Sequence, residues 1–323
     1  MRSRDLSNSS YNPTLTMPVT SVTVSEDNQK KLDELISRVP ELLLTLDDPQ
    51  YDEIFGYRIN SDDKEYVDVD VRDEILYKFL VASEYVVDTA ADRIVATLNW
   101  RNKFNPLSAA YVEKFGSELD SLGVITNFKR DQSGLSVVTW NLYGNIKSPK
   151  KIFEQYGDDE GEDTGSPFLR WRIGLMERSL SFLKFTEEEN NRAAQVHDYN
   201  NVSMFRMDPG MKVATKQIIS LFGDHYPELL SVKFFINVPI LMSWMFAAVK
   251  ALGVVSADTA KKFQVMNGGD LIDWFGVQLP VAYGGTSAGE LKELEADVKT
   301  VGIPEYAQQI LGRAVEENNL TVE

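Results

Sequence analysis

The sequence contains no cysteine and only two histidines, His197 and His225, among its 323 residues. The absence of cysteine excludes disulfides, a thiolate nucleophile, iron–sulfur ligation and cysteine-based zinc sites. Two histidines are too few for a multi-histidine metal centre. Basic residues are also scarce, since 33 Lys and Arg stand against 49 Asp and Glu and give a net charge of −16. A chain this acidic is poorly suited to hold a nucleic-acid backbone, so we expect no nucleic-acid partner.

Residues 1–27 lack the apolar core of a secretory signal peptide. They are rich in Ser, Asn and Thr, and Pro13 and Pro18 disfavour an amphipathic targeting helix. We therefore expect a disordered tail over residues 1–27 and a protein of the cell interior.

The segment from Phe234 to Val255 is the longest apolar stretch, yet Asn237, Pro239 and Lys250 interrupt it. Its cleanly apolar part is too short to cross a bilayer. From Ile240 onward nearly every face of a helix would be apolar, which indicates either a deeply buried helix or a lid over an apolar ligand.

The spacing of apolar residues changes along the chain. Before Gly123 it is helical and predicts helices over residues 28–46, 72–83 and 89–104, with Pro40 breaking or restarting the first. Beyond it, β-branched and aromatic runs predict strands over residues 124–128, 135–143, 193–199 and 232–238. Between these strands lie helical runs over residues 167–185 and 211–222, and a charged helix over 291–298 and another from Pro304 close the chain. This alternation of strand and helix predicts an α/β fold.

The expected strand ending at Tyr199 carries a pair of candidate ligands. Alternation along a strand places Gln195, His197 and Tyr199 on one face. A His and a Tyr that point together into a cavity can provide a metal or haem ligand and its neighbour, because phenolate is a known axial ligand of haem iron. The same pair could equally be hydrogen-bonded to each other within the core.

Arg172 is a second candidate, because on a helix it shares a mainly apolar face with Phe168 and Met176. A buried, unpaired guanidinium is very unfavourable, so this side chain requires an anion. A haem propionate, a phosphate, a phenolate or an internal glutamate would each suffice.

Residues Gly285 to Gly289 satisfy the G-x-S-x-G pattern of serine hydrolases. In those enzymes the catalytic histidine follows the serine, whereas both histidines here precede it. Nucleotide-binding and zinc-protease motifs are also missing from the sequence. We therefore expect a small-residue linker at this point and a protein that is not an enzyme.

A set of motifs in the second half of the chain resembles the signature of CRAL-TRIO lipid-binding proteins. The motifs are Tyr226-Pro227-Glu228, Ile236-Asn237-x-Pro239, the apolar helix and Lys262-Phe263, with Leu98-x-Trp100-Arg101 similar to the family's N-terminal helical module. The resemblance implies a lipid-binding α/β fold in which a mixed sheet forms the floor and a helical gate, here from Ile240, forms the lid. The implied divisions are a tail (1–27), a helical module (28–114), the ligand-binding domain (115–285) and a C-terminal linker with helices (286–323).

Three further blocks resemble a fungal branch of this family, the non-classical phosphatidylinositol transfer proteins that bind haem. These blocks are Thr139–Gly144, Arg172–Glu177 and Gln195–Tyr199. The resemblance implies a pocket for haem b in which Tyr199 is the axial iron ligand and His197 its neighbour. Tyr143, Arg172 and Lys233 would line the same pocket. Some members carry an extra tyrosine where this chain has Ser83, and Tyr85 would face a different side of that helix.

The lipid-exchanging members of the family imply a second set of residues. Glu228 and Lys262 match the pair that helps to hold an inositol phosphate headgroup. The sequence Ala82-Ser83-Glu84 replaces a usual basic triplet, which disfavours exchange with phosphatidylcholine. The resemblance thus implies a phosphatidylinositol- and haem-binding protein of the cytoplasm that associates peripherally with endoplasmic reticulum membranes, in stress response or phosphoinositide homeostasis. The alternative is a pure phosphatidylinositol carrier with no haem role.

Overall fold

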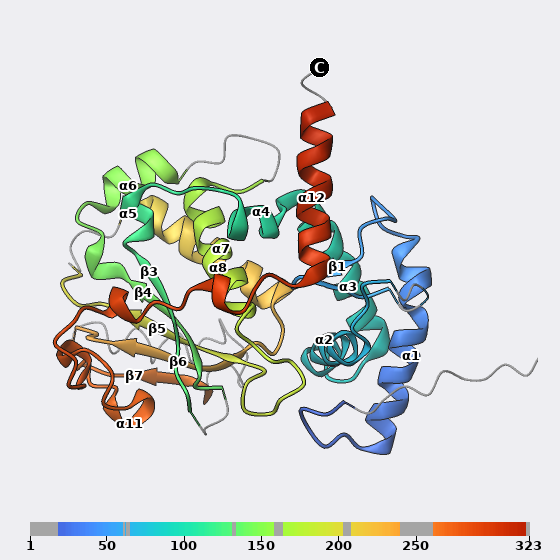
Figure 1. Ribbon diagram of the computed structural model, residues 1–323, viewed down its shortest axis with the longest axis horizontal. Helices are drawn as coiled ribbons and strands as arrows, with labels where there is room; N and C mark the ends of the chain where they lie inside the picture. Colours follow the sequence, from blue (N-terminus) through green and yellow to red (C-terminus); the bar gives the residue numbers. More distant parts are fainter. Residues whose placement is uncertain are drawn as a thin grey trace, which may run out of the picture.

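The structure is a computed structural model that describes residues 19–60, 62, 65–130, 134–157, 164–202, 208–239 and 261–320. Within these residues, a mixed five-stranded sheet packs against helices, and the N-terminal helices lie beside the sheet (Figure 1). The expected α/β fold is confirmed. No helix of the described part is long and apolar enough to span a bilayer. The expected gate from Ile240 lies outside the described residues.

The N-terminal module contains three helices and a short hairpin. Their bounds are α1 (Glu26–Leu43), β1 (Glu53–Ile54), β2 (Tyr57–Arg58), α2 (Val69–Ala82) and α3 (Val87–Phe104). Ser25 caps α1 by accepting from the Asn28 amide, and α1 continues through Pro40 instead of breaking there. Asn105, in a left-handed conformation with φ 51°, ends α3 and caps the next helix, α4 (Pro106–Tyr111).

Residues 19–27 of the expected disordered tail are ordered, whereas residues 1–18 lie outside the described part of the chain. Val19 and Ser21 are buried, and the Glu74 carboxylate on α2 accepts hydrogen bonds from the Thr20 amide (2.9 Å) and the Ser21 amide (2.8 Å). The Ser21 hydroxyl donates to the same carboxylate at 2.6 Å. A buried carboxylate needs such donors, so it holds residues 19–21 against the module.

The sheet has the strand order β3-β4-β5-β6-β7. The strands are β3 (Gly123–Asn127), β4 (Val137–Leu142), β5 (Ala193–Asp198), β6 (Leu230–Ile236) and β7 (Phe263–Val265). β3 pairs antiparallel with β4, and the other neighbours are parallel, which gives the mixed sheet that the family resemblance implied. The connecting helices are α5 (Ser117–Asp120), α6 (Pro149–Tyr156), α7 (Pro167–Leu180) and α8 (Pro209–His225).

One face of this sheet is apolar and closed. Trp140, Val196 and Phe234 are register partners on β4, β5 and β6, and all three are fully buried. Phe275 of α11 (Ile272–Phe275) packs on this face, with its ring centroid 5.9 Å from Trp140 and 5.5 Å from Phe234. The opposite face lies under α7 and carries the buried polar residues Thr139, Gln195 and His197, so we call it the polar face.

The C-terminal segment differs from expectation in one element. The prediction of a charged helix over 291–298 is wrong, because the chain forms two short 3-10 helices there, η4 (Leu291–Leu294) and η5 (Val298–Thr300). Between them, the Ala296 amide donates to the Ile125 carbonyl at 2.8 Å on the edge of β3, which requires extended chain there. The expected final helix is present as α12 (Glu305–Leu320), which projects from the body (Figure 1).

A buried ion cluster joins the helical module to the sheet domain. The Arg101 guanidinium of α3 donates to Glu53 at 2.8 and 3.0 Å and to Glu177 of α7 at 2.6 Å. All three side chains are at most 2% exposed. Burial alone would lower the pKa of Arg101, but Glu177 and Glu53 outweigh it and hold the pKa well above its usual value.

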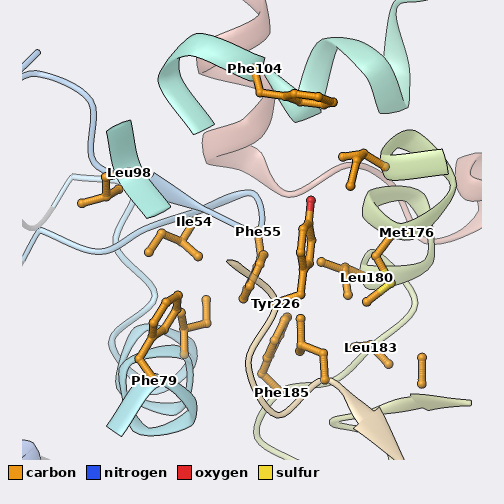
Figure 2. Packing of buried hydrophobic residues seen from close by; sticks show 14 of the residues in the cluster. Ile54, Phe55, Phe79, Leu98, Phe104, Met176, Leu180, Leu183, Phe185 and Tyr226 are labelled. Atoms are coloured by element: carbon orange, nitrogen blue, oxygen red, sulfur yellow. The ribbon is translucent and has the colours of Figure 1, made fainter. Parts of the chain in front are cut away.

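Two tyrosines complete this cluster. The Tyr226 hydroxyl donates to Glu177 at 2.6 Å, and the Tyr51 hydroxyl donates to Glu53 at 2.8 Å. Figure 2 shows Tyr226 beside Phe55 of the β1–β2 turn, and their ring centroids lie 5.5 Å apart. Because Tyr226 immediately precedes Pro227-Glu228, the cluster also fixes the start of the chain into β6.

We predict that Arg101→Met destabilises the protein by about 3–5 kcal/mol, because it leaves Glu53 and Glu177 buried without a counter-charge. Urea unfolding followed by circular dichroism measures this. The control is Arg38→Met, which removes a pair with the exposed Asp88 carboxylate and should change stability by less than about 1 kcal/mol. Equal losses in the two variants would contradict the importance of the cluster.

Candidate functional site

The polar face of the sheet presents two rows of side chains, because directly paired residues share a face. The register pairs Thr139 with Gln195, Gln195 with Lys233, and Lys233 with Phe263. The second row lies two residues further along each strand and consists of Asn141, His197, Phe235 and Val265. The sequence-based alternation of Gln195 and His197 therefore matches the structure, and Lys233 joins them from the neighbouring strand.

Polar atoms on this face lack hydrogen-bond partners among the described residues. They are Thr139 Oγ1, Asn141 Oδ1, Gln195 Oε1 and His197 Nε2. All four residues are at most 7% exposed. Buried polar groups in folded proteins are nearly always hydrogen-bonded, so several unsatisfied groups on one face indicate a place for a polar ligand.

Arg172 of α7 faces the same region and is also unsatisfied. It is 2% exposed, and none of its three guanidinium nitrogens has a hydrogen-bond partner in the described part of the chain. Its guanidinium carbon lies 4.7 Å from the Phe222 ring centre of α8, a cation–π contact. No ion pair within the described residues reaches it, so the internal salt bridge considered from the sequence is not observed there.

The three basic side chains of this face repel one another. Burial, followed by the charge of Arg172, lowers the pKa of Lys233 to about 7. Burial, followed by Lys233 and Arg172, lowers the pKa of His197 well below its usual value. Burial also lowers the pKa of Arg172 to about 10, and the groups that oppose this are the phenols Tyr143 and Tyr226. Among the described residues no carboxylate contributes to these shifts, so the arrangement favours an anionic ligand.

An aromatic group surrounds the end of β5. The Tyr143 hydroxyl lies 2.9 Å from His197 Nδ1, and the Tyr143 ring centroid lies 5.4 Å from that of Tyr199. His197 stacks on Phe235 with centroids 5.2 Å apart. The structure thus brings together Tyr143, His197 and Tyr199, with Lys233 and Arg172 close enough to act on His197 electrostatically.

Both tyrosines are protonated phenols in this environment. Burial, and then the neighbouring Tyr143, raises the pKa of Tyr199 above its usual value. Burial also raises the pKa of Tyr143, although the charge of Arg172 partly opposes that shift. A metal ligated by either oxygen must therefore displace a proton. Within the described residues, no group of three His, Asp or Glu side chains forms a metal site of another kind.

The expected headgroup residues lie at the opposite end of the strands. Lys262 Nζ is 3.3 Å from the Glu228 carboxylate, and the side chains are 22% and 34% exposed. The Lys262 carbonyl accepts from the Lys233 amide at 2.9 Å, which places the pair beside the first polar row. The structure therefore brings Glu228 and Lys262 together at the edge where β6 and β7 begin.

Ser83 occupies the position where some family members carry an extra tyrosine, and Tyr85 lies two residues later. Ser83 is buried at the end of α2, and its hydroxyl has no partner among the described residues. Tyr85 turns back toward the same helix, with its hydroxyl 3.1 Å from that of Tyr77. Tyr85 therefore satisfies another phenol and is separate from the cluster around Tyr199.

Sequence reasoning missed some residues of this face. Thr139, Asn141, Phe222, Phe235 and Phe263 were not singled out as site residues, yet they line the rows or contact their cations. Alternation within β4 and β6 gives the face of each residue, but only the register between strands shows which residues lie side by side.

Comparison with known proteins identifies the family and agrees with the fold. The CRAL/TRIO domain profile matches residues 121–285. The phosphatidylinositol transfer protein SFH5 of Debaryomyces hansenii is 55% identical over 317 residues, covering 94% of this chain and 92% of that protein. Its namesake in Candida albicans is 52% identical over 304 residues, covering 93% of each. The crystal structure of Sfh5 superposes with a TM-score of 0.80 at 34% identity, covering 92% of this chain and 100% of that one.

We predict that Arg172→Met stabilises the ligand-free protein by about 1–2 kcal/mol, because it replaces an unsatisfied buried charge by an apolar chain of similar length. Urea unfolding measures the difference. The matched control is Arg170→Met on the same helix, which removes a 2.8 Å hydrogen bond to Glu113 and should destabilise the protein. A loss of stability in Arg172→Met would contradict the assignment of an unsatisfied guanidinium.

Proposed function

We propose that this chain, which belongs to the CRAL/TRIO domain family, binds phosphatidylinositol and transfers it between membranes. Its relatives in Debaryomyces and Candida bear the name phosphatidylinositol transfer protein and match nearly their whole length. The observation that carries the proposal is the polar face of the sheet, where cations lie together with polar groups that have no partner among the described residues, and no described carboxylate acts on the cations.

The Glu228–Lys262 pair supports a headgroup site at the start of β6 and β7. A carboxylate accepts hydrogen bonds from sugar hydroxyls, and an ammonium binds a phosphate as a point charge. Partial exposure of both side chains leaves them open to a ligand. An inositol phosphate headgroup offers both the hydroxyls and the phosphate that this pair would recognise.

The aromatic and apolar side chains of the two rows suit the rest of a lipid. Carrying a diacyl lipid through water requires an enclosed apolar cavity, because each buried methylene contributes about 0.8 kcal/mol. Phe235, Phe263 and Val265 continue the face beyond Lys233. We propose that the segment from Ile240 closes this cavity and contacts membranes peripherally, in the cytoplasm and at the endoplasmic reticulum. In this proposal the protein is a carrier without catalytic activity.

We predict that Glu228→Ala and Lys262→Ala each slow phosphatidylinositol transfer between vesicles about tenfold, because each removes one charge-assisted contact to the headgroup. Transfer of a fluorescent phosphatidylinositol between vesicle populations measures this. Lys292→Ala is the control, since Lys292 forms a surface pair with Glu295. If transfer is insensitive to both site variants, the headgroup lies elsewhere.

Haem b is a second candidate ligand, favoured by the aromatic group at the end of β5. The buried His197 Nε2 and Arg172 nitrogens have no hydrogen-bond partner in the described part of the chain, and Arg172 and Lys233 offer two cations for two propionates. The phenol of Tyr199 stands within an aromatic setting that fits a planar macrocycle. These residues fit the group: Tyr199 would bind the iron, with His197 and Tyr143 as its neighbours. When bound, haem supplies a ferric Lewis acid that can stabilise phenolate.

The pH dependence of haem binding follows from Tyr199. Its pKa is raised in the ligand-free protein, so binding as phenolate releases one proton. Affinity should therefore rise about tenfold per pH unit wherever this is the only proton exchanged. Lys233, with a pKa of about 7, takes up a proton when an anion binds near neutral pH, and this uptake offsets the release from Tyr199. At about pH 5.5–6.5 Lys233 is already protonated, so haem affinity should be measured against pH in that range.

We predict that the wild-type protein, purified without added haem, shows a Soret band with about one iron per chain, because Tyr199 and the cations complete a haem site. Tyr199→Phe should lose the band and the iron but keep its unfolding midpoint within a few degrees. Absorption spectroscopy and iron analysis measure this, with Tyr85→Phe as the matched tyrosine control. Stoichiometric haem in Tyr199→Phe, or no band in wild type even after haem is added, would remove this candidate.

A further inference from the structure

Lys78 of α2 connects the helical module to the edge of the sheet where the strands begin. Its ammonium donates to the Asn191 carbonyl and to the Glu228 carbonyl, each at 3.1 Å. Lys78 is 5% exposed. These two carbonyls lie two residues before β5 and β6, so one buried cation holds the entry points of both strands.

The backbone of Glu228 requires such support. Glu228 has φ 50°, in the left-handed region that non-glycine residues rarely occupy. A residue in that region persists only where its surroundings hold it there. The Lys78 hydrogen bond to its carbonyl is such a constraint, and the resulting orientation directs the Glu228 carboxylate to Lys262 Nζ at 3.3 Å.

The charges around Lys78 agree with a positioning role. Burial, followed by Arg192, lowers the pKa of Lys78 to about 7, while Glu74 and Glu228 oppose the shift. Glu74 already accepts three hydrogen bonds from residues 20 and 21. The Lys78 ammonium instead donates to two backbone carbonyls, the groups that set chain direction, and no carboxylate within the described residues forms an ion pair with it.

We propose that Lys78 is a positioning residue for the headgroup site: by holding the Glu228 carbonyl, it sets the Glu228–Lys262 pair to receive an inositol phosphate. This inference rests on the proposed lipid function. It makes the helical module part of headgroup recognition, because the cation that shapes the site comes from α2 and the site itself lies on β6 and β7.

The test is a double-mutant cycle on phosphatidylinositol transfer with the full chain. The variants are Lys78→Met, Glu228→Ala and the combination of both. Each single change should slow transfer about tenfold, and the combination should be no slower than Glu228→Ala alone, because Lys78 acts through Glu228. A purely structural role for Lys78 would instead multiply the two effects.

Two further variants separate positioning from general stability. Lys78→Arg keeps the charge and the donors and should restore transfer to within about threefold of wild type. It also provides the comparison if Lys78→Met folds poorly. Arg93→Met is the matched control, because Arg93 also bridges the module to backbone carbonyls, at Asp224 (2.9 Å) and Gly223, but not at Glu228. It should lower the unfolding midpoint and leave the transfer rate per folded protein unchanged.

The outcomes distinguish this inference from the lipid proposal. Normal transfer by Lys78→Met, or multiplied effects in the combination, would overturn the role of Lys78 while wild-type transfer stands. Wild-type protein that transfers no phosphatidylinositol would overturn the lipid function, and the positioning role with it. An effect of Lys78→Met without any effect of Glu228→Ala would also overturn the inference, because Lys78 could not then act through Glu228.

Discussion

The ion cluster around Arg101 is the constraint on which the remaining structure depends. It places one cation and two carboxylates, Glu53 and Glu177, where water does not reach them. Such a cluster is tolerable only when every partner is in place. The module, the β1–β2 hairpin and α7 therefore have one mutual arrangement, and Tyr226 ties the chain before β6 to the same point.

α7 carries both a satisfied and an unsatisfied charge. Glu177 belongs to the cluster, whereas Arg172, five residues earlier, lies well around the helix and meets the polar face of the sheet. Locking one side of α7 therefore keeps the guanidinium of Arg172 in place, although no described residue forms a hydrogen bond with it. The free energy of burying that charge is tolerated because the rest of the helix is so firmly fixed, and a ligand anion would recover it.

The polar face of the sheet has two chemically different ends. The ion pair of Glu228 and Lys262 lies where β6 and β7 begin, and the aromatic group around Tyr199 lies where β5 ends. Six residues of strand separate these ends by about 20 Å. Lys233 lies between them: its amide donates to the Lys262 carbonyl, and its charge, with that of Arg172, acts on His197. Among the described residues, the helical module contacts the first end through Lys78.

Periodicity is a local property of the chain, so it was enough to predict the α/β class and the main helices and strands, and the family motifs pointed to Tyr199 and Glu228. The register that sets Gln195 beside Lys233 could not be predicted, nor could the loss of the helix expected over 291–298 to an edge contact with β3. The amino-acid sequence also left open whether Arg172 has an internal carboxylate, and among the described residues none reaches it. These points follow from the folded structure, because pairing, burial and missing partners arise between residues far apart in the chain.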